Sequence, residues 1–368
     1  MARPTNAIDF WRGCALVTIA IDHVPGNLYV NYTLHNYALS DASEIFVFLA
    51  GWALRLVADG RAARADPSAA QWRLVRRSGR LYLSQVVFSL LALAILAVAA
   101  NWLQAPFLYD WNAAGPVFAE PLRGLIGLFT LLTQLGYFNI LPLYVVLMLG
   151  APLWIMLYRA RPALLLPVSL ALYIVALAFH INLPNWPAPG SWFLNPLAWQ
   201  LIFVLGFSIG GKTGIGLLAR RHHRALFYVS LPILALGWAA SHWHYAPVSP
   251  MTPWLRLFVS FNKTFESPAR ILNMLALAAA VPGLFEVFHR IGASVTEVFA
   301  KLGRNSLSVF CVGSLASLVG QIYRYVVGGG FANDTMIVLS TLLVLWITAW
   351  YTENLSPRLW RAAASPLG

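Results

Sequence analysis

Charged residues are scarce in this chain of 368 residues. Only 10% of them are Asp, Glu, Lys or Arg, whereas a soluble domain carries about a quarter. Hydrophobic residues make up 59%, and the mean hydropathy is +0.68. The two cysteines, Cys14 and Cys311, both lie in apolar segments, which argues against a disulfide framework and a cysteine-based metal site. The composition excludes an ordinary soluble domain and predicts an all-α polytopic membrane protein.

Acidic residues are the rarer charge: 13 stand against 25 Lys and Arg, which gives a net charge of +12 and an isoelectric point near 10.0. A basic chain suggests nucleic acid, but long apolar runs separate the arginines and leave no room for a soluble basic face. We therefore expect no nucleic-acid partner and interpret the arginines first as determinants of membrane topology.

Ten segments are candidates for membrane helices, each of which needs about 20 apolar residues. They are 8–29, 40–58, 81–103, 136–158, 162–180, 193–210, 225–243, 269–288, 304–325 and 334–353. Segment 122–135 is a further candidate for a re-entrant or surface helix, so nine to twelve spans fit the sequence. Because we find no internal repeat and no soluble domain boundary, residues 1–368 are predicted to form a single membrane domain.

The first segment is expected to be a retained span and not a cleaved export signal. Asp9, Arg12 and Asp22 interrupt it, and Pro25-Gly26 follows where a signal would have a small-residue cleavage site.

The distribution of basic residues supports ten spans with both termini in the cytoplasm. In that arrangement twenty of the 25 Lys and Arg residues fall on the cytoplasmic side, as the positive-inside rule requires. The five on the other side are Arg123, Arg256, Lys263, Arg270 and Arg324. The basic loop 55–80 is interpreted chiefly as a topology determinant, with polyphosphate binding as the alternative.

Ionisable side chains inside spans are costly and usually mark functional positions. They concentrate in the first two predicted spans. In the first, Arg12 and His23 are eleven residues apart, which puts them on one helix face with a separation of about 16 Å along the axis. Asp9 is placed to pair with Arg12, while Asp22 is adjacent to His23 and faces another way.

Asp41 and Glu44 share a face at the outer end of the second predicted span. A carboxylate within reach of His23 would hold the tautomer of the imidazole and raise its basicity. The structural alternatives are that Asp41 caps its helix, that Arg12 anchors the cytoplasmic end and that His23 is a hydrogen-bonded core residue.

Two further clusters are candidate ligand sites. Arg270, at the start of a predicted span, suits a substrate carboxylate, or it forms a salt bridge with Glu266. Arg304, Asn305 and Ser306 open another span, where Asn305 and Ser306 cap the helix or, together with Arg304, contact an anionic ligand from the cytoplasm. His180, His242, His244 and His289 lie at span ends, and we assign them no role.

The outer loops 104–135, 181–196 and 244–268 are rich in Trp and Tyr. These rings are interfacial anchors or sugar-stacking platforms, and the sequence does not choose between the two.

Several strings resemble the OpgC family, membrane succinyltransferases that act on osmoregulated periplasmic glucans, within a wider group of transmembrane acyltransferases. The resemblance covers nearly the whole chain, and its strings are Asp9-Phe10-Trp11-Arg12-Gly13, Asp22-His23-Val24-Pro25-Gly26-Asn27, 40–51, 138–144, Asn195-Pro196-Leu197-Ala198-Trp199-Gln200 and Gly303-Arg304-Asn305-Ser306-Leu307. Arg12 and His23 also fit an Arg-x10-His pattern of the acyltransferase-3 members.

The resemblance implies a ten-helix enzyme of the bacterial inner membrane that passes a succinyl group from cytoplasmic succinyl-CoA to a glucan hydroxyl on the far side. Succinyl-CoA would be a co-substrate, with no permanently bound cofactor and no metal. His23 would be the general base, with Asp41 or Glu44 orienting it or binding sugar hydroxyls. Glucan, succinyl-CoA and the lipid bilayer are the implied partners, and a homodimer is compatible with the sequence.

The remaining site residues take binding roles under this hypothesis. Asp22 and Arg270 would bind substrate, Arg270 by pairing with the succinyl carboxylate. Arg12, Arg304, Asn305 and Ser306 would line the path of CoA. The alternative function is a transporter of glucan or acyl-lipid whose buried charges line a pathway.

Overall fold

The structure is a computed structural model that describes residues 5–242 and 263–354. It is 81% helical, and these ranges contain no β-strand, which confirms the all-α class. Most of the predicted outer loop 244–268 lies outside the described residues, including His244 and Arg256.

The chain divides into two compact units, each considered by itself: unit 1 holds the described residues up to Phe46 and from Ala280 onward, and unit 2 holds Val47–Ala279. The elements of unit 1 are α1 (Ala7–Asp22), η1 (Leu28–Tyr32), α2 (Leu34–Tyr37), the start of α3 (Ala42–Ala58), α15 (Pro282–Ile291), α16 (Ala293–Arg304), α17 (Ser306–Val327) and α18 (Phe331–Asn354). Unit 2 contains the rest of α3, then α4 (Arg61–Ala65), α5 (Pro67–Trp102), η2 (Pro106–Ala113), α6 (Gly115–Ala119), α7 (Pro121–Phe129), α8 (Ile140–Ala160), η3 (Pro162–Leu164), α9 (Leu165–Ala178), α10 (Pro196–Gly210), α11 (Ile215–Arg221), α12 (His223–His242) and α14 (Pro268–Ala280).

Each of the ten predicted segments contains a helix, but the ends differ. The largest difference in the first two spans is in α1, which ends at Asp22 where the prediction ran to residue 29. The physical reason lies in the chain that follows: Pro25 disfavours helix in the residue before it, and Gly26 adopts a positive φ of 76°.

Several helices are long and apolar enough to cross a membrane, which confirms a polytopic membrane protein. Among the described residues, five qualify alone: α5, α8, α12, α17 and α18. Counting the bent pair α10–α11 and the broken pair α14–α15 as one span each raises the number to seven. Because α1, α3 and α9 have only 16, 17 and 14 residues, the count of ten spans and the cytoplasmic termini remain predictions.

The basic segment 55–80 is not a loop, contrary to the prediction. It comprises the end of α3, the short α4 and the first turns of α5, a helix of 36 residues. Asp66 caps α5 by accepting a hydrogen bond from Ala69 N at 2.9 Å, and Pro67 occupies the first turn, where its missing N–H costs nothing. Because of these two residues, α5 begins at Pro67, well before the apolar segment that starts at residue 81.

Segment 122–135 contains only part of a helix, since α7 ends at Phe129. Beyond it Thr133 donates a hydrogen bond from its hydroxyl to Trp186 O at 2.6 Å. The re-entrant character of this segment stays a prediction.

Glycines allow close helix contacts in both units. In unit 2, a Cβ on Gly206 would overlap the carbonyl oxygen of Phe48, and one on Gly51 would overlap that of Phe203, so α3 and α10 touch through their backbones. In unit 1, a Cβ on Gly13 would overlap Phe299 O and one on Gly303 would overlap Asp9 O, which brings α1 against α16. Small residues at helix crossings are typical of membrane bundles.

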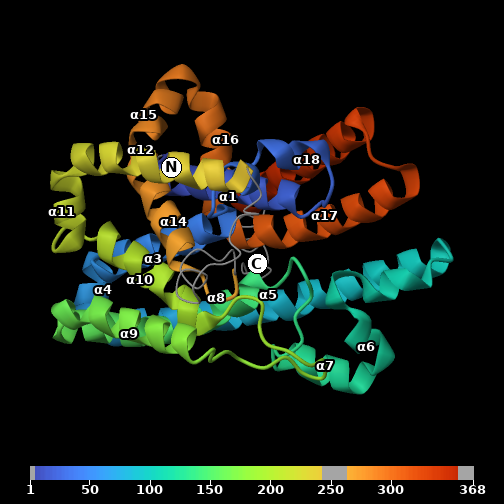
Figure 1. Cartoon of the computed structure of the whole chain (residues 1–368). Coiled ribbons are helices and arrows are strands. Elements are labelled where there is room, and N and C mark those ends of the chain that lie inside the picture. Colours follow the sequence, from blue (N-terminus) through green and yellow to red (C-terminus); the bar gives the residue numbers. More distant parts are fainter. Residues whose placement is uncertain (1–4, 243–262, 355–368) are drawn as a thin grey trace, which may run out of the picture. The chain divides into compact units, whose positions relative to one another are not determined.

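The remaining helices of unit 1 complete the environment of α1. Figure 1 shows α17 and α18 running side by side as an antiparallel pair. α1 also packs against α17, so it has α16 along its first half and α17 toward its end.

Candidate functional site

The first helix carries the two residues with the clearest predicted roles. Asn6 caps α1 by accepting a hydrogen bond from Asp9 N at 3.0 Å, and the helix is continuous from Ala7 to Asp22. His23 is its C-terminal cap residue, with φ −77° and ψ 2°. Arg12 and His23 therefore belong to the same helix, with a rise of about 16 Å between them.

At the N-terminal end of α1, the predicted pairing of Asp9 with Arg12 is confirmed. The closest oxygen and nitrogen of the two side chains are 3.8 Å apart, and both side chains are buried. Asn6 Nδ2 donates to Asp9 Oδ2 at 2.6 Å. Asp9 is thus engaged by a cap residue as well as by a cation, which fixes the start of the helix.

At the other end, the main chain of His23 is held by α17. Gln321 Nε2 donates to His23 O at 2.5 Å. The imidazole meets the ring of Phe310 edge to face, with ring centroids 6.5 Å apart and planes at 81°. Asp22, the last residue of α1, is partly exposed beside it.

The segment after His23 is stabilised by its own asparagine. Asn27 is buried, and its Nδ2 donates to Ile21 O at 2.8 Å and to Val24 O at 2.6 Å. Its Oδ1 accepts from Tyr29 N at 2.8 Å, which starts the helix η1. Asn27 therefore binds main-chain groups on both sides of the Pro25-Gly26 turn.

Asp41 and Glu44 form a cap for α3, the structural alternative that the sequence left open. Asp41 Oδ1 accepts from Ser43 N at 2.8 Å, and Glu44 Oε2 accepts from Asp41 N at 3.1 Å. This reciprocal pattern is a capping box. Glu44 is fully buried. A catalytic role for either carboxylate stays a prediction, and any such role must be compatible with this cap.

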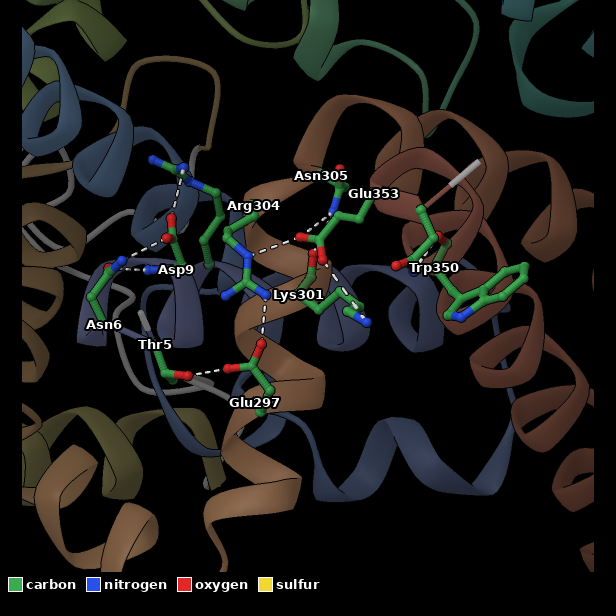
Figure 2. Close-up of polar contacts among 11 residues, drawn as sticks. Thr5, Asn6, Asp9, Glu297, Lys301, Arg304, Asn305, Trp350 and Glu353 are labelled. Atoms are coloured by element: carbon green, nitrogen blue, oxygen red, sulfur yellow. Dashed lines mark hydrogen bonds and ion pairs between the residues drawn. The ribbon is translucent and has the colours of Figure 1, made fainter. Parts of the chain in front are cut away.

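Arg304 and Asn305 lie in an ion-pair network that joins α16 to α18 (Figure 2). Arg304 donates from Nη2 to Glu297 Oε1 at 2.6 Å and from Nε to Glu353 Oε1 at 2.8 Å. Asn305 Nδ2 donates to the same Glu353 oxygen at 3.0 Å, and Lys301 Nζ lies 3.9 Å from Oε2. Thr5 hydrogen-bonds the second oxygen of Glu297, so the network also holds the start of the chain.

The network determines what Arg304 has left to offer a ligand. Its side chain is 9% exposed, and within the described part of the chain its buried Nη1 has no hydrogen-bond partner. Nε and Nη2 each already donate to a carboxylate, so an anionic ligand at those atoms must compete with Glu353 and Glu297. Ser306 is the first residue of α17, next to this cluster.

The charges of the network shift the pKa of Glu297. Burial alone raises it, but hydrogen bonds from Arg304 and Thr5 and the charges of Arg304 and Lys301 outweigh burial, so the pKa lies below its usual value. Glu297 is therefore ionised at neutral pH.

In unit 2, Arg270 forms the salt bridge with Glu266 that the sequence offered as an alternative. Arg270 Nε and Glu266 Oε1 are 3.4 Å apart, with side chains 8% and 0% exposed. Tyr173 donates its hydroxyl to Glu266 O at 2.6 Å, which fixes the backbone beside the pair. A substrate carboxylate at Arg270 would share the guanidinium with Glu266.

Sequence reasoning missed the pair formed by Arg324 and Asp334. Arg324 Nε donates to Asp334 Oδ1 at 2.9 Å, and Asp334 is fully buried near the start of α18. The sequence predicts only that Arg324 is one of the five basic residues on the non-cytoplasmic side. An acidic residue inside an otherwise apolar predicted span was the available signal, because such a residue requires a partner.

The sequence also does not predict the contacts of Arg55 in unit 2, because Arg55 falls within the basic segment 55–80. Its guanidinium lies 4.0 Å from the ring centroid of Tyr158 and donates to Asp59 at 2.7 Å from Nε and to Tyr158 Oη at 2.6 Å from Nη2. It is buried and joins α3 to α8. Its role is structural, since aromatic and acidic groups surround it.

Within residues 5–242 and 263–354, no group of three His, Cys, Asp or Glu side chains is arranged to hold a metal ion. The chemistry that the described residues offer is acid–base chemistry at His23 and the carboxylates, together with anion binding by the arginines.

The comparisons with known proteins point to one family. No curated protein and no solved structure matches the chain. A family model described as OpgC protein matches residues 4–356, which is nearly the whole length and includes both units. The chain therefore belongs to the OpgC family, which is linked to the succinylation of osmoregulated periplasmic glucans.

Proposed function

We propose that the protein transfers a succinyl group from cytoplasmic succinyl-CoA to glucose hydroxyls of periplasmic glucans across the bacterial inner membrane. The observation that carries the proposal is the continuous helix α1, which has the buried Arg12 near one end and His23 at the other, in a chain of the OpgC family. A group near each end of one helix suits a reaction whose donor and acceptor come from opposite sides of the membrane.

The proposed chemistry uses His23 as a general base. Its imidazole takes the proton of a glucose hydroxyl while the oxygen attacks the thioester carbonyl of succinyl-CoA. The tetrahedral intermediate collapses with breakage of the carbon–sulfur bond, and the imidazolium returns the proton to the CoA sulfur. The products are an ester of glucose and free CoA, so no oxidant, metal or permanently bound cofactor is required.

The other residues of unit 1 take supporting roles. Asp41 or Glu44 orients His23 or binds sugar hydroxyls, and Asp22 contributes to the binding of the glucan. Arg12 belongs to the entrance for CoA. Arg304, together with Asn305 and Ser306, lines the same path, where its contact with CoA is through Nη1, because Nε and Nη2 each already donate to a glutamate.

Arg270 is proposed to bind the free carboxylate of the succinyl group. Support comes from its buried guanidinium, a group that pairs strongly with carboxylates. Because Glu266 is the resident partner, the succinyl carboxylate would form a second pair with the same cation.

The test is direct assay of the purified protein in liposomes with succinyl-CoA and glucan, following free CoA and succinylated glucan. The wild type is expected to release one CoA for each ester formed. Glucan uptake without ester formation would contradict the proposal and favour a transporter.

Substitution of His23 tests the base. His23→Ala is expected to lower kcat by at least about 100-fold, the lower range for loss of a general base. His222→Ala is the matched control, because His222 is exposed at the end of α11 and has no proposed role. Wild-type turnover in His23→Ala would exclude His23 as the base.

Substitution of Arg270 tests the choice of donor. Arg270→Ala is expected to reduce kcat/KM for succinyl-CoA more than for acetyl-CoA, since only succinyl has the carboxylate. Arg123→Ala, which removes an exposed arginine paired with Glu120, is the control. Equal losses for both donors would remove Arg270 from the carboxylate site.

A further inference from the structure

Three side chains of α17 form a ladder of hydrogen-bond donors to the end of α1. The residues are four and three positions apart, so they lie on one helix face. Each binds a main-chain oxygen: Ser317 Oγ donates to Ala20 O at 2.8 Å, Gln321 Nε2 to His23 O at 2.5 Å, and Arg324 Nη2 to Gly26 O at 2.5 Å. The acceptors also recur every three residues, so the ladder follows the chain through His23.

The ladder meets a need that helix geometry creates. The last carbonyl oxygens of a helix have no partner within it, and in a membrane environment an unsatisfied carbonyl is costly because water is absent. Ser317 is fully buried and Gln321 is 9% exposed. Ser317 and Gln321 therefore take the place of water at the end of α1.

A buried acid on α18 fixes the last donor of the ladder. Asp334 accepts from Arg324 Nε at 2.9 Å with one oxygen and from Leu28 N at 3.0 Å with the other. The turn between His23 and Leu28 is thereby held from both sides. Gly26, with φ +76°, lies against the guanidinium: a Cβ there would be 3.0 Å from Arg324 Nη1.

Two glycines of α17 bring it close to α18. Cβ atoms on Gly313 and Gly320 would each lie 2.8 Å from a side chain of α18, Leu345 and Ile337 respectively, so the two helices pack closely along their length. Phe310 lies two turns before Ser317 on the same face of α17. Its ring makes the edge-to-face contact with the His23 imidazole. α17, packed against α18, thus contacts both the backbone and the ring of His23.

We propose that Ser317, Gln321 and Arg324 are positioning residues, which set the direction of the His23 imidazole by fixing the main chain that carries it. The inference rests on the proposed role of His23 as the base. A displacement of about 1 Å in a reacting group lowers a rate by about 100-fold. Loss of the ladder should therefore lower kcat and leave KM nearly unchanged.

The test compares two serines that differ in what they bind. Ser317→Ala removes a hydroxyl that bonds α1, whereas the control Ser340→Ala removes one that bonds Ile337 O within α18 itself. Gln321→Met, of similar volume, removes the donor to His23. Two readouts are taken on full-length protein in liposomes: kcat and KM for acyl transfer, and the rate at which diethyl pyrocarbonate modifies His23, measured by mass spectrometry relative to His222 in the same sample.

We expect Gln321→Met to lower kcat by about 10- to 100-fold with KM changed less than about twofold, and Ser317→Ala to act in the same direction more weakly. Both should change the relative modification rate of His23, and Ser340→Ala should leave both readouts at the wild-type level. If Gln321→Met does not fold, Ser317→Ala decides.

An unchanged His23 modification rate in the variants that fold would overturn the inference whatever the activity, and so would an equal change in Ser340→Ala. If the wild type transfers no acyl group, the proposed function fails while the modification rates still report on the ladder. The two failures are therefore distinguishable.

Discussion

The two ends of α1 are fixed by opposite kinds of interaction. Near its first residues the contacts join charged side chains: Asp9 with Arg12, and close by Arg304 with Glu297 and Glu353. Near its last residues the acceptors are main-chain oxygens, reached by Ser317, Gln321 and Arg324. The polar contacts of the first end depend mainly on charge, and those of the second mainly on geometry.

The difference predicts which kinds of change each end of α1 tolerates. The energy of a charge interaction falls only gradually with distance, and it is weakened by salt and by a pH change that neutralises one partner. Hydrogen bonds to a carbonyl weaken steeply when the donor shifts. With the proposed general base at the second end and the paired arginines at the first, this difference fits the proposed reaction, in which one group moves a proton and the others hold an anion.

The largest effect is expected from a substitution at the backbone contact between α16 and the first half of α1. In Gly303→Ala the new methyl group overlaps Asp9 O, and because a backbone cannot give way cheaply we expect a loss of about 3 kcal/mol in unfolding free energy. Gly283→Ala is the matched control, since nothing lies within 4 Å of a Cβ there. Thermal unfolding in detergent measures both, and equal melting temperatures would contradict the close contact between α1 and α16.

The next effect sharpens the electrostatic side of the comparison. Arg304→Met removes the cation that pairs with both Glu297 and Glu353, although Lys301 stays 3.9 Å from Glu353. We expect a loss of about 2 kcal/mol, below the usual range for breaking a buried pair because both acids are partly exposed. Adding Glu297→Gln and Glu353→Gln should restore part of the stability. Failure of this rescue would show that Arg304 acts through packing. Arg123→Ala, an exposed arginine paired with Glu120, should change stability by less than about 1 kcal/mol.

The smallest effect is a dependence on pH. The pKa of Glu297 is lower in the folded protein than its ordinary value of 4.5, so its contribution to stability is complete above that value and is lost as the pH falls through the folded pKa. We expect the melting temperature to fall below about pH 4.5, and the fall to be smaller in Glu297→Gln. The same acid-induced change in both proteins would assign it to other groups.

Much of the fold could be predicted because hydropathy is a local property. Every predicted apolar segment contains a helix, yet the end of α1 and the start of α5 were missed. Both depend on single residues that an apolar average ignores: Pro25 and Gly26 after α1, and Asp66 with Pro67 before α5.

The contacts of the site could be predicted only where the two partners are close in sequence. The pairings of Asp9 with Arg12 and of Arg270 with Glu266, three and four residues apart, follow from helix spacing. The contact of Arg304 with Glu353 joins residues 49 positions apart, and no local pattern predicts it. The ladder from α17 to α1 spans almost 300 residues and ends on main-chain oxygens, which have no sequence signature at all.

The pair of Arg324 and Asp334 also has a consequence for biosynthesis. Each residue alone would make insertion of its helix into the bilayer less favourable, by about 3 kcal/mol at the centre of a span and less near its ends. The two lie on either side of the short connection between α17 and α18, ten positions apart, where their charges cancel as soon as the helices fold against each other. The translocon can thus release α17 and α18 into lipid together as one hairpin, already neutral at its tip.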